Sequence, residues 1–454
     1  MMKRIALISA ALICLTFLFP STQYAKEPVK KPATQKETVP LITEVMTKEE
    51  LQAYLKEKGI PIITKENFKE PELVWEKTFD EPIREISDIT EKGNCIAKGS
   101  PASGTQPDSS LLFINNKGDL RKRIALGNLK ENGRDVFVSA DVAKSGKYAA
   151  VFKVPVKEKK EKIIIFYYDE EGKSLWSKPV DEVYTSIISY NGETIAIQEG
   201  NPRWSEEEWS PGDKNINKVR FYNSEGKLLS EYGGYRNFSQ WMLSDDGKYF
   251  AAYVWRMDDQ DREKGSLIYF DVSTGKVLWE KSLKAKHWLN VGGPYSLAVS
   301  EKGSYVAAAV MKSDKKKTDG TDDKEVVIFN KDGHPIVRIP GKDVSKVRED
   351  NFLSGGSLKK GWIDVNKSKA TGLMGYPPYF FKLVDVETID EKTNDRIAKT
   401  HRILSKDEEV LWEKDLLRGH FNFTKDWRYL VGTQYIDKNH KKIIIYKLFI
   451  NPKL

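Results

Sequence analysis

From residue 72 onward, short apolar stretches alternate with turns that are rich in Gly, Asn and Asp. Their length and two-residue periodicity are typical of β-strands. One type of turn places Gly and Lys before an apolar strand, as in Asp245-Asp-Gly-Lys-Tyr-Phe-Ala-Ala252. A second type places a Gly before a more polar strand, and these glycines recur 49 to 58 residues apart: Gly118, Gly172, Gly226, Gly275 and Gly333. The alternation predicts a repeated unit of four strands.

A short motif around a tryptophan repeats along the chain. It reads Glu72-Leu-Val-Trp-Glu-Lys77, Lys276-Val-Leu-Trp-Glu-Lys281 and Glu409-Val-Leu-Trp-Glu-Lys414, with a weaker copy at Lys173-Ser-Leu-Trp-Ser-Lys178. Each copy coincides with the expected fourth, outer strand of a unit. Four-stranded units of about 50 residues that recur in this way predict the blades of a β-propeller. We expect the tryptophans to wedge between blades.

Counting the outer strands predicts an all-β, seven-bladed propeller of four-stranded antiparallel blades. The outer strands are centred near Leu73, Leu120, Leu175, Leu228, Leu278, Ile336 and Leu411. The last blade runs from Phe421 to about residue 450 and contains only three strands before the chain ends. We therefore expect residues 72–79 to supply its fourth strand, which closes the ring and removes exposed sheet edges.

The repeats resemble those of known propeller families. Asp271-Val-Ser-Thr-Gly-Lys-Val-Leu-Trp-Glu280 resembles the repeat of PQQ-like (quinoprotein-type) propellers, and Ser244-Asp-Asp-Gly-Lys-Tyr-Phe-Ala251 resembles that of WD40-like and TolB-like propellers. The resemblance covers about residues 72–450. It implies the fold but no particular activity, because propellers have many roles.

The region before the repeats predicts export. Lys3 and Arg4 precede an apolar run that ends at Pro20, so residues 1–25 are expected to be a signal peptide; a retained anchor is the alternative. Residues 26–45 are Lys- and Pro-rich and predict a linker. Residues 46–71 predict a lead-in with a short helix, because Thr47-Lys-Glu-Glu50 forms a capping box. The propeller then spans 72–454.

Charge and cysteine content narrow the function further. The chain carries 74 basic and 66 acidic residues, interspersed over its length, which indicates no nucleic-acid interface but permits weak attraction to anionic surface polymers. After signal cleavage Cys95 is the one remaining cysteine, so no intramolecular disulfide is expected. We expect Cys95 to be a buried strand residue, the mature protein to have no transmembrane segment, and the chain to be a monomer.

The candidate binding face lies on the long connections between the second and third strands of each blade. We expect these loops at about 99–109, 154–162, 200–217, 255–265, 312–324 and within 373–396. Variable loops on a rigid scaffold commonly carry binding sites. The candidate residues are Arg203, Trp204, Glu206, Glu207, Glu208, Trp209, Trp255, Arg256, Tyr376 and Tyr379. The alternative is that these aromatic residues pack the loops onto their own blades.

Signatures of catalysis are lacking in the sequence. The five histidines are scattered without metal-ligand spacing, no Gly-x-Ser-x-Gly motif occurs, and the aspartates of Lys312–Asp323 lie among lysines that oppose a cation. We therefore expect no catalytic residues, metal or cofactor. The favoured hypothesis is an exported binding or scaffold module at the cell envelope, with a protein or cell-surface polymer as partner. The alternatives are a lyase or glycan hydrolase that uses the central channel, and an envelope assembly factor.

Overall fold

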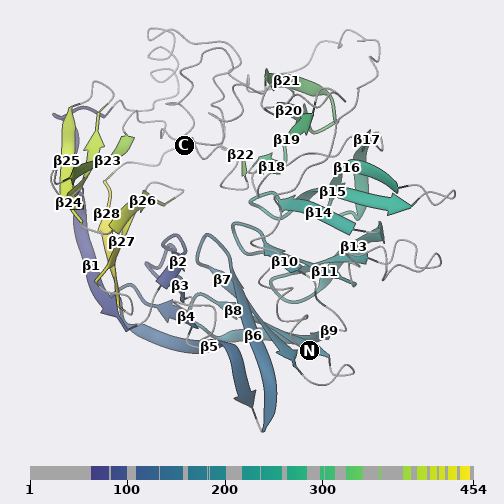
Figure 1. Ribbon diagram of the computed structural model, residues 1–454, viewed down its shortest axis with the longest axis horizontal. Helices are drawn as coiled ribbons and strands as arrows, with labels where there is room; N and C mark the ends of the chain where they lie inside the picture. The colour runs from purple at the N-terminus through teal and green to yellow at the C-terminus, as the bar shows by residue number, and fades with distance from the viewer. Residues whose placement is uncertain are drawn as a thin grey trace. The chain divides into compact units, whose positions relative to one another are not determined.

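The computed structural model consists of antiparallel β-sheets (Figure 1). It describes residues 63–80, 83–99, 109–131, 133–156, 162–180, 183, 185–200, 217–235, 237–257, 263–283, 297–300, 302–311, 324–340, 357–358, 382–389, 396–405, 409–416, 419–424, 428–436 and 440–449. The expected signal peptide, the linker and the capped helix lie outside these ranges. Within them, no helix is long and apolar enough to cross a membrane. The chain divides into two compact units, residues 1–45 with 180–374 and residues 46–179 with 375–454.

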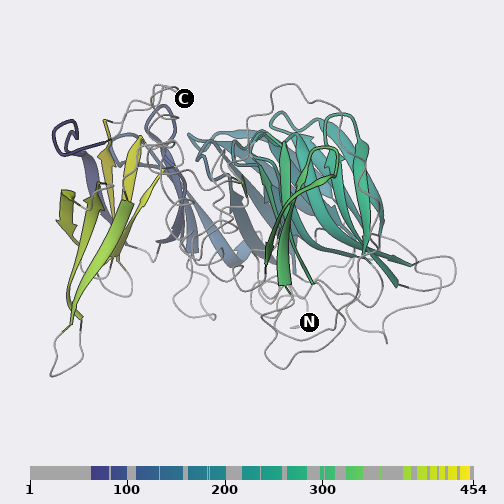
Figure 2. The same ribbon diagram turned by 90° about the horizontal axis from the view of Figure 1, so that it is seen from above.

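In the unit around residues 180–374, three successive sheets follow the predicted order of strands, and Figure 2 shows them from above. The first contains β10 (Thr185–Ile188), β11 (Thr194–Glu199), β12 (Asn217–Asn223) and β13 (Leu228–Tyr235). The second contains β14 (Asn237–Leu243), β15 (Tyr249–Met257), β16 (Glu263–Asp271) and β17 (Lys276–Leu283). The third contains β18 (Leu297–Ser300), β19 (Tyr305–Met311), β20 (Lys324–Asn330) and β21 (Pro335–Pro340), and β22 (Ser357–Leu358) adds to β18 in parallel.

In the other unit, two four-stranded repeats merge into one sheet of eight strands, because β5 and β6 form a continuous hairpin. Its strands are β2 (Ile83–Ile86), β3 (Cys95–Gly99), β4 (Ser109–Ile114), β5 (Leu120–Glu131), β6 (Arg134–Val142), β7 (Tyr148–Pro155), β8 (Ile163–Asp169) and β9 (Ser174–Val180). A further sheet contains β23 (Lys382–Ile389), β24 (Arg396–Leu404) and β25 (Val410–Asp415). In the described residues this sheet has three strands where four were expected.

The last sheet joins strands from the two ends of the repeat region. It contains β26 (Gly419–Phe423), β27 (Tyr429–Tyr435), β28 (Lys441–Lys447) and β1 (Glu72–Phe79), and β1 occupies the outer edge. The antiparallel register runs from Glu72 opposite Lys447 to Phe79 opposite Lys441. Lys441 is almost fully buried and its ammonium donates a hydrogen bond to the carbonyl of Ile83, where the chain enters β2. The predicted pairing of residues 72–79 with the last strand is therefore present.

The turns between first and second strands are stabilised by a buried hydroxyl. The Ser244 hydroxyl accepts a hydrogen bond of 3.0 Å from the backbone N–H of Tyr249, and Gly247 between them has a φ of 71°. The hydroxyls of Ser189 and Ser300 accept equivalent hydrogen bonds from the backbone N–H groups of Thr194 and Tyr305. Such side-chain acceptors satisfy backbone donors that the tight turn leaves unpaired. The Ser-Asp-Asp-Gly-Lys pattern is thus a turn signal.

The turns before the outer strands depend on a residue that the sequence analysis did not single out. An Asn or Asp at the end of the third strand accepts backbone N–H groups of the turn; the Asn330 side chain accepts from His334 at 2.8 Å and from Asp332 at 3.1 Å. Asn115, Asp169, Asn223 and Asp271 do the same in their own turns. Asn and Asp favour such turns. Their recurrence three or four residues before each turn glycine was the available signal.

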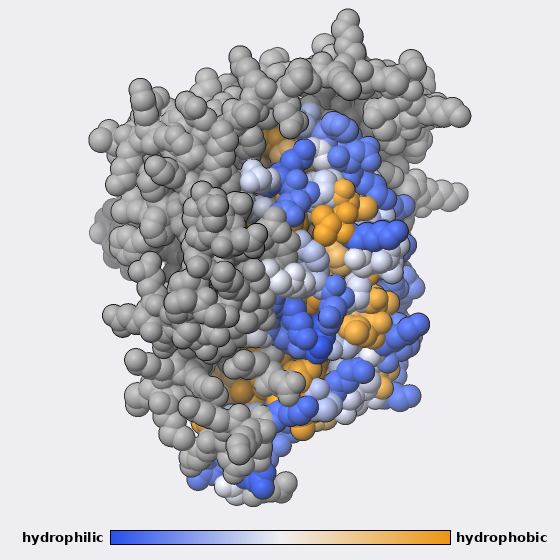
Figure 3. Space-filling model, turned by 90° about the vertical axis from the view of Figure 1, so that its right-hand side faces the viewer, coloured by the Kyte–Doolittle hydropathy of each residue, from blue (hydrophilic) through white to orange (hydrophobic). Residues whose placement is uncertain are grey.

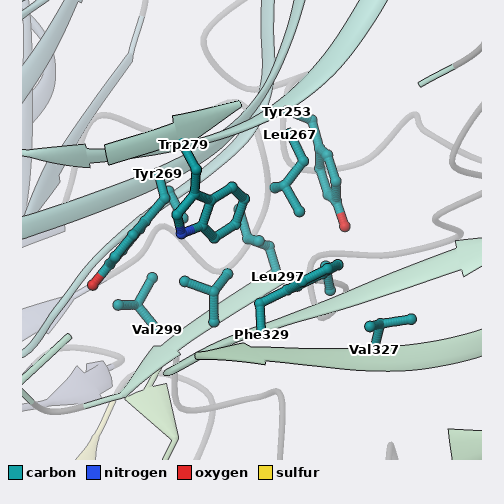
Figure 4. Close-up of a cluster of buried hydrophobic side chains, with 11 residues drawn as sticks. Tyr253, Leu267, Tyr269, Trp279, Leu297, Val299, Val327 and Phe329 are labelled. Carbon is teal, nitrogen blue, oxygen red and sulfur yellow. The ribbon is translucent and has the colours of Figure 1, made fainter. Parts of the chain in front are cut away.

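The repeated tryptophans are structural, as predicted. Trp279 of β17 is 8% exposed and packs with side chains of β18 and β20 in the cluster that Figure 4 shows. Its Nε1 donates to the carbonyl of Lys331 at 3.1 Å, and a Cβ at Gly333 would lie 2.8 Å from its ring. A Cβ at Gly118 would likewise lie 2.9 Å from the ring of Trp75. The rings of Trp75 and Trp279 therefore pack against the turn of the next sheet.

Candidate functional site

Two of the loops expected to carry aromatic residues begin and end on neighbouring sheets of one unit. The connection between β11 and β12 spans residues 200–216, as predicted. Arg203, Trp204, Glu206, Glu207, Glu208 and Trp209 lie in this connection and outside the described residues. The connection between β15 and β16 is shorter than expected, because Trp255 and Arg256 lie in β15 with their backbones paired to Gly265 and Lys264. Their side chains are outside the described set.

Strand register brings the roots of these two loops to the same end of the two sheets. Asn217, the first residue of β12, pairs with Tyr235 at the end of β13. Two residues later, Asn237 begins β14 and pairs with Trp255. The polypeptide thus runs from one loop root to the other through a connection of one residue between β13 and β14.

The remaining candidates, Tyr376 and Tyr379, lie outside the described residues and precede β23 in the chain. The connection between β23 and β24 spans residues 390–395. Lys382 pairs with Leu404, so the chain enters β23 at the end opposite that connection. The loop expected within 373–396 is therefore located at 390–395, inside the expected range.

Charged side chains link three strands at the root of the 200–216 loop. Glu199, 6% exposed, accepts hydrogen bonds from Nη1 of Arg220 at 2.9 and 2.8 Å. Nε of Arg220 donates to Glu231 at 3.1 Å, and Nζ of Lys218 lies 3.9 Å from Glu199. Burial opposes the charge of Arg220, but Glu231 and Glu199 outweigh it, so the pKa of the guanidinium is raised. The cluster links the end of β11 to the middle of β12 and β13, and sequence spacing alone did not reveal it.

The opposite face of the same strands carries a buried amide. Gln198 is fully buried, and strand alternation places it on the face of Ala196 and Val219, which packs against β14 and β15. Asn217 is 1% exposed on this same face. Gly200 has a φ of 112°, and a Cβ there would lie 2.3 Å from Oδ1 of Asn217. The chain therefore turns out of the sheet directly over buried amide groups.

No three His, Cys, Asp or Glu side chains among the described residues form a potential metal site. The first strands β10, β14 and β18 contain no His, Arg, Asp or Glu. Cys95 is fully buried, and burial raises the pKa of its thiol to about 12, which disfavours the reactive thiolate. The buried strand position predicted for Cys95 is confirmed.

The outer strands expose apolar side chains at repeated positions. In the unit around residues 180–374 these are Leu228, Val277 and Leu278, each 38–45% exposed. On the face in Figure 3, orange areas are separated by blue, polar residues. Apolar residues scattered in this way are normal on protein surfaces, so this face does not compete with the loop roots as a candidate site.

Comparison with known proteins gives likenesses of fold. No protein-family model matches the chain, and no curated protein matches it. The structure resembles the Dos1 propeller, with 10% identity, a TM-score of 0.38, and coverage of 83% of this chain and 95% of that one. It also resembles the β-propeller domain of the Trilobed protease from Pyrococcus furiosus, with 12% identity, a TM-score of 0.37, and coverage of 83% and 98%. It resembles TolB from Acinetobacter baumannii with 14% identity, a TM-score of 0.30, and coverage of 57% of this chain and 54% of that one.

These structures include β-propellers of several kinds, and nothing about ligands or activity follows from likenesses at such TM-scores. They assign the chain to no sequence family. The repeated four-stranded antiparallel sheets are themselves the units of a β-propeller repeat protein.

Proposed function

We propose that the protein is an exported, non-catalytic β-propeller that binds a protein or cell-surface polymer at the cell envelope. The ligand contacts the loops that connect β11 to β12 and β15 to β16. The observation that carries this proposal is the common root of the two loops, which the pairings of Asn217 with Tyr235 and of Asn237 with Trp255 define. Loops held close together on rigid strands are suited to a shared ligand.

The chemistry of the loops fits a recognition surface. Residues 203–209 combine two tryptophans, an arginine and three glutamates, and Trp255 and Arg256 stand at the root of the second loop. Aromatic and arginine side chains dominate the energetics of protein interfaces. The Glu199–Arg220–Glu231 cluster beneath them limits movement of the loop root, which lowers the entropy lost on binding.

The number of blades and the closure of the ring are part of the same proposal. We take the repeats as seven blades of one ring, closed by β1 in the last blade. Support comes from the pairing of β1 with β28 and from the hydrogen bond between Lys441 and Ile83. A closed ring leaves only short, protected strand edges and makes a stable platform for loops.

Affinity capture tests the proposed function. The mature chain, residues 26–454, serves as bait for cell-envelope and culture-medium extracts, beside a variant in which 201–216 and 258–262 are shortened. A control carries Glu225→Ala and Lys248→Ala at the opposite end of the same sheets, where both residues are exposed. We expect one partner to be retained by the mature chain and the control and lost by the shortened variant. Retention by all three baits would refute the proposed binding face.

A further inference from the structure

The segment that precedes β1 packs against two sheets of its unit. Ile63 is 8% exposed and belongs to an apolar cluster, and the partly buried Phe68 packs against the same cluster. The other members come from the β23–β25 sheet, from the last sheet and from residues just beyond them: Ile403, Leu411, Leu416, Phe421, Leu430, Ile444, Tyr446 and Leu448. We call residues 63–70 the clasp, because Ile63 and Phe68 lie at the seam where these two sheets meet.

A third contact joins the clasp to the end of the last sheet. Nζ of Lys69 lies 3.5 Å from the centre of the Phe449 ring, and Nζ of Lys447 lies 5.8 Å from it. Phe449 is 37% exposed, and cation–π pairs that remain in contact with water are weak. The clasp therefore depends mainly on the burial of Ile63 and Phe68.

The clasp lacks the backbone pairing that holds the strands. Within it, the backbone N–H of Phe68 donates to the carbonyl of Thr64 at 2.9 Å, and that of Thr64 donates to Oδ1 of Asn67 at 2.8 Å. In the part of the chain that the structure describes, no backbone-to-backbone hydrogen bond joins residues 63–70 to a strand. By contrast, β1 pairs with β28 from Glu72 to Phe79. Opening the clasp therefore breaks side-chain contacts and leaves the sheet intact.

Such a segment opens more easily than the strands beside it. Holding the clasp closed removes conformational entropy from every residue in it, and the burial of one aliphatic side chain and part of one ring compensates for only a share of that loss. Segments with few buried contacts and few backbone hydrogen bonds open locally while the rest of the domain stays folded. We propose that the clasp is a conformational switch: it detaches while β1 stays paired, and its release loosens the β23–β25 sheet against the last sheet.

The switch goes beyond the proposed binding function, because it needs neither the loops nor a ligand. Release removes Ile63 from the cluster and exposes apolar surface of both sheets. The β23–β25 sheet has three strands in the described residues, so it has fewer contacts of its own to keep it in place. Lys65 and Lys69 are exposed, and a protease that cuts after lysine would make the release permanent. The clasp thus gives the N-terminal segment control over the seam.

Thiol labelling of the mature chain tests whether the clasp detaches. Cys95 is the one cysteine in residues 26–454 and is fully buried, so an introduced cysteine supplies the signal. Ile63→Cys reports exposure of the clasp, and Ile444→Cys reports exposure of the same cluster from β28. With a thiol reagent at pH 8, we expect Ile63→Cys to react at least about tenfold faster than Ile444→Cys. Equal rates would show that the clasp opens only when the sheets unfold, and would overturn the inference.

Hydrogen exchange measured by mass spectrometry tests the effect on the seam. Ile63→Ala weakens the clasp, and Lys65→Ala is the matched control, because Lys65 is exposed in the same segment. We expect Ile63→Ala to speed exchange in β24 and β25 about tenfold, since the lost burial favours the open state, and to leave β11–β13 of the other unit unchanged. The control should match the wild type. Unchanged exchange in β24 and β25, or an equal rise in β11–β13, would contradict a switch at this seam.

Discussion

Replacing Trp75 by alanine tests whether the N-terminal strand β1 holds the last sheet to the next one. Trp75 is 7% exposed and belongs to a cluster that joins β1 and β28 to β3 and β4. A buried tryptophan covers roughly 150–250 Å² of apolar surface, which corresponds to about 4–6 kcal/mol at about 25 cal/mol per Å². The remaining alanine stays partly buried, so we expect Trp75→Ala to lower the free energy of unfolding by about 3–5 kcal/mol.

Leu73→Ala is the matched control in the same strand. Leu73 is 47% exposed, and its backbone pairing with Tyr446 is unaffected by the substitution, so the change should stay within about 0.5 kcal/mol. Urea unfolding of both variants is followed by far-UV circular dichroism. The free energies of unfolding are compared with the same slope of free energy against urea concentration. A loss for Trp75→Ala no larger than that for Leu73→Ala would refute the role assigned to the tryptophan.

Three further outcomes follow from the structure. Removing residues 1–80 should destabilise the sheet of β26–β28 whereas removing residues 1–62 should not, and equal melting temperatures would contradict closure by β1. Burial would raise the pKa of Glu170, but hydrogen bonds from Thr90 and Asn94 and the ion pair with Lys92 lower it. The stabilisation is therefore present above the ordinary carboxyl pKa and is lost as pH falls. The loss in free energy of unfolding that Glu170→Gln shows at pH 7 in chemical unfolding should shrink below about pH 4. Cys95 in the mature chain should react with a thiol reagent at pH 8 only after unfolding; rapid labelling of the native protein would contradict its burial.

Much of the local architecture was predictable because the repeat carries its own signals. The Gly-Lys turns and the Leu-Trp strands repeat closely enough to align the strands, and the similarity of residues 72–77 to the other outer strands predicted the pairing of β1 with β28. The burial of Trp75 and Trp279 followed from the same comparison. These features are local in sequence, or are copies of local features.

The parts that could not be predicted depend on contacts between strands. Glu199 is 21 residues from Arg220, and only the register of β11 with β12 brings the two together. The burial of the Gln198 amide depends on which face of β11 is covered by the next sheet. Trp255 was assigned to a loop because charged residues follow it, but backbone pairing extends β15 to Met257. Aspartate-rich sequence is therefore a poor guide to where a long hairpin ends.

Cross-linking in the full chain tests the shared binding face most directly. A photoreactive amino acid is placed at position 204, at position 255 and, as a control, at position 227, where the exposed Lys227 lies in the turn at the opposite end of the β10–β13 sheet. After irradiation of the producing cells, the adducts are identified by mass spectrometry. The account predicts the same partner at positions 204 and 255 and none at 227. Different partners at 204 and 255, or the same partner at 227, would contradict a common site at the roots of the two loops.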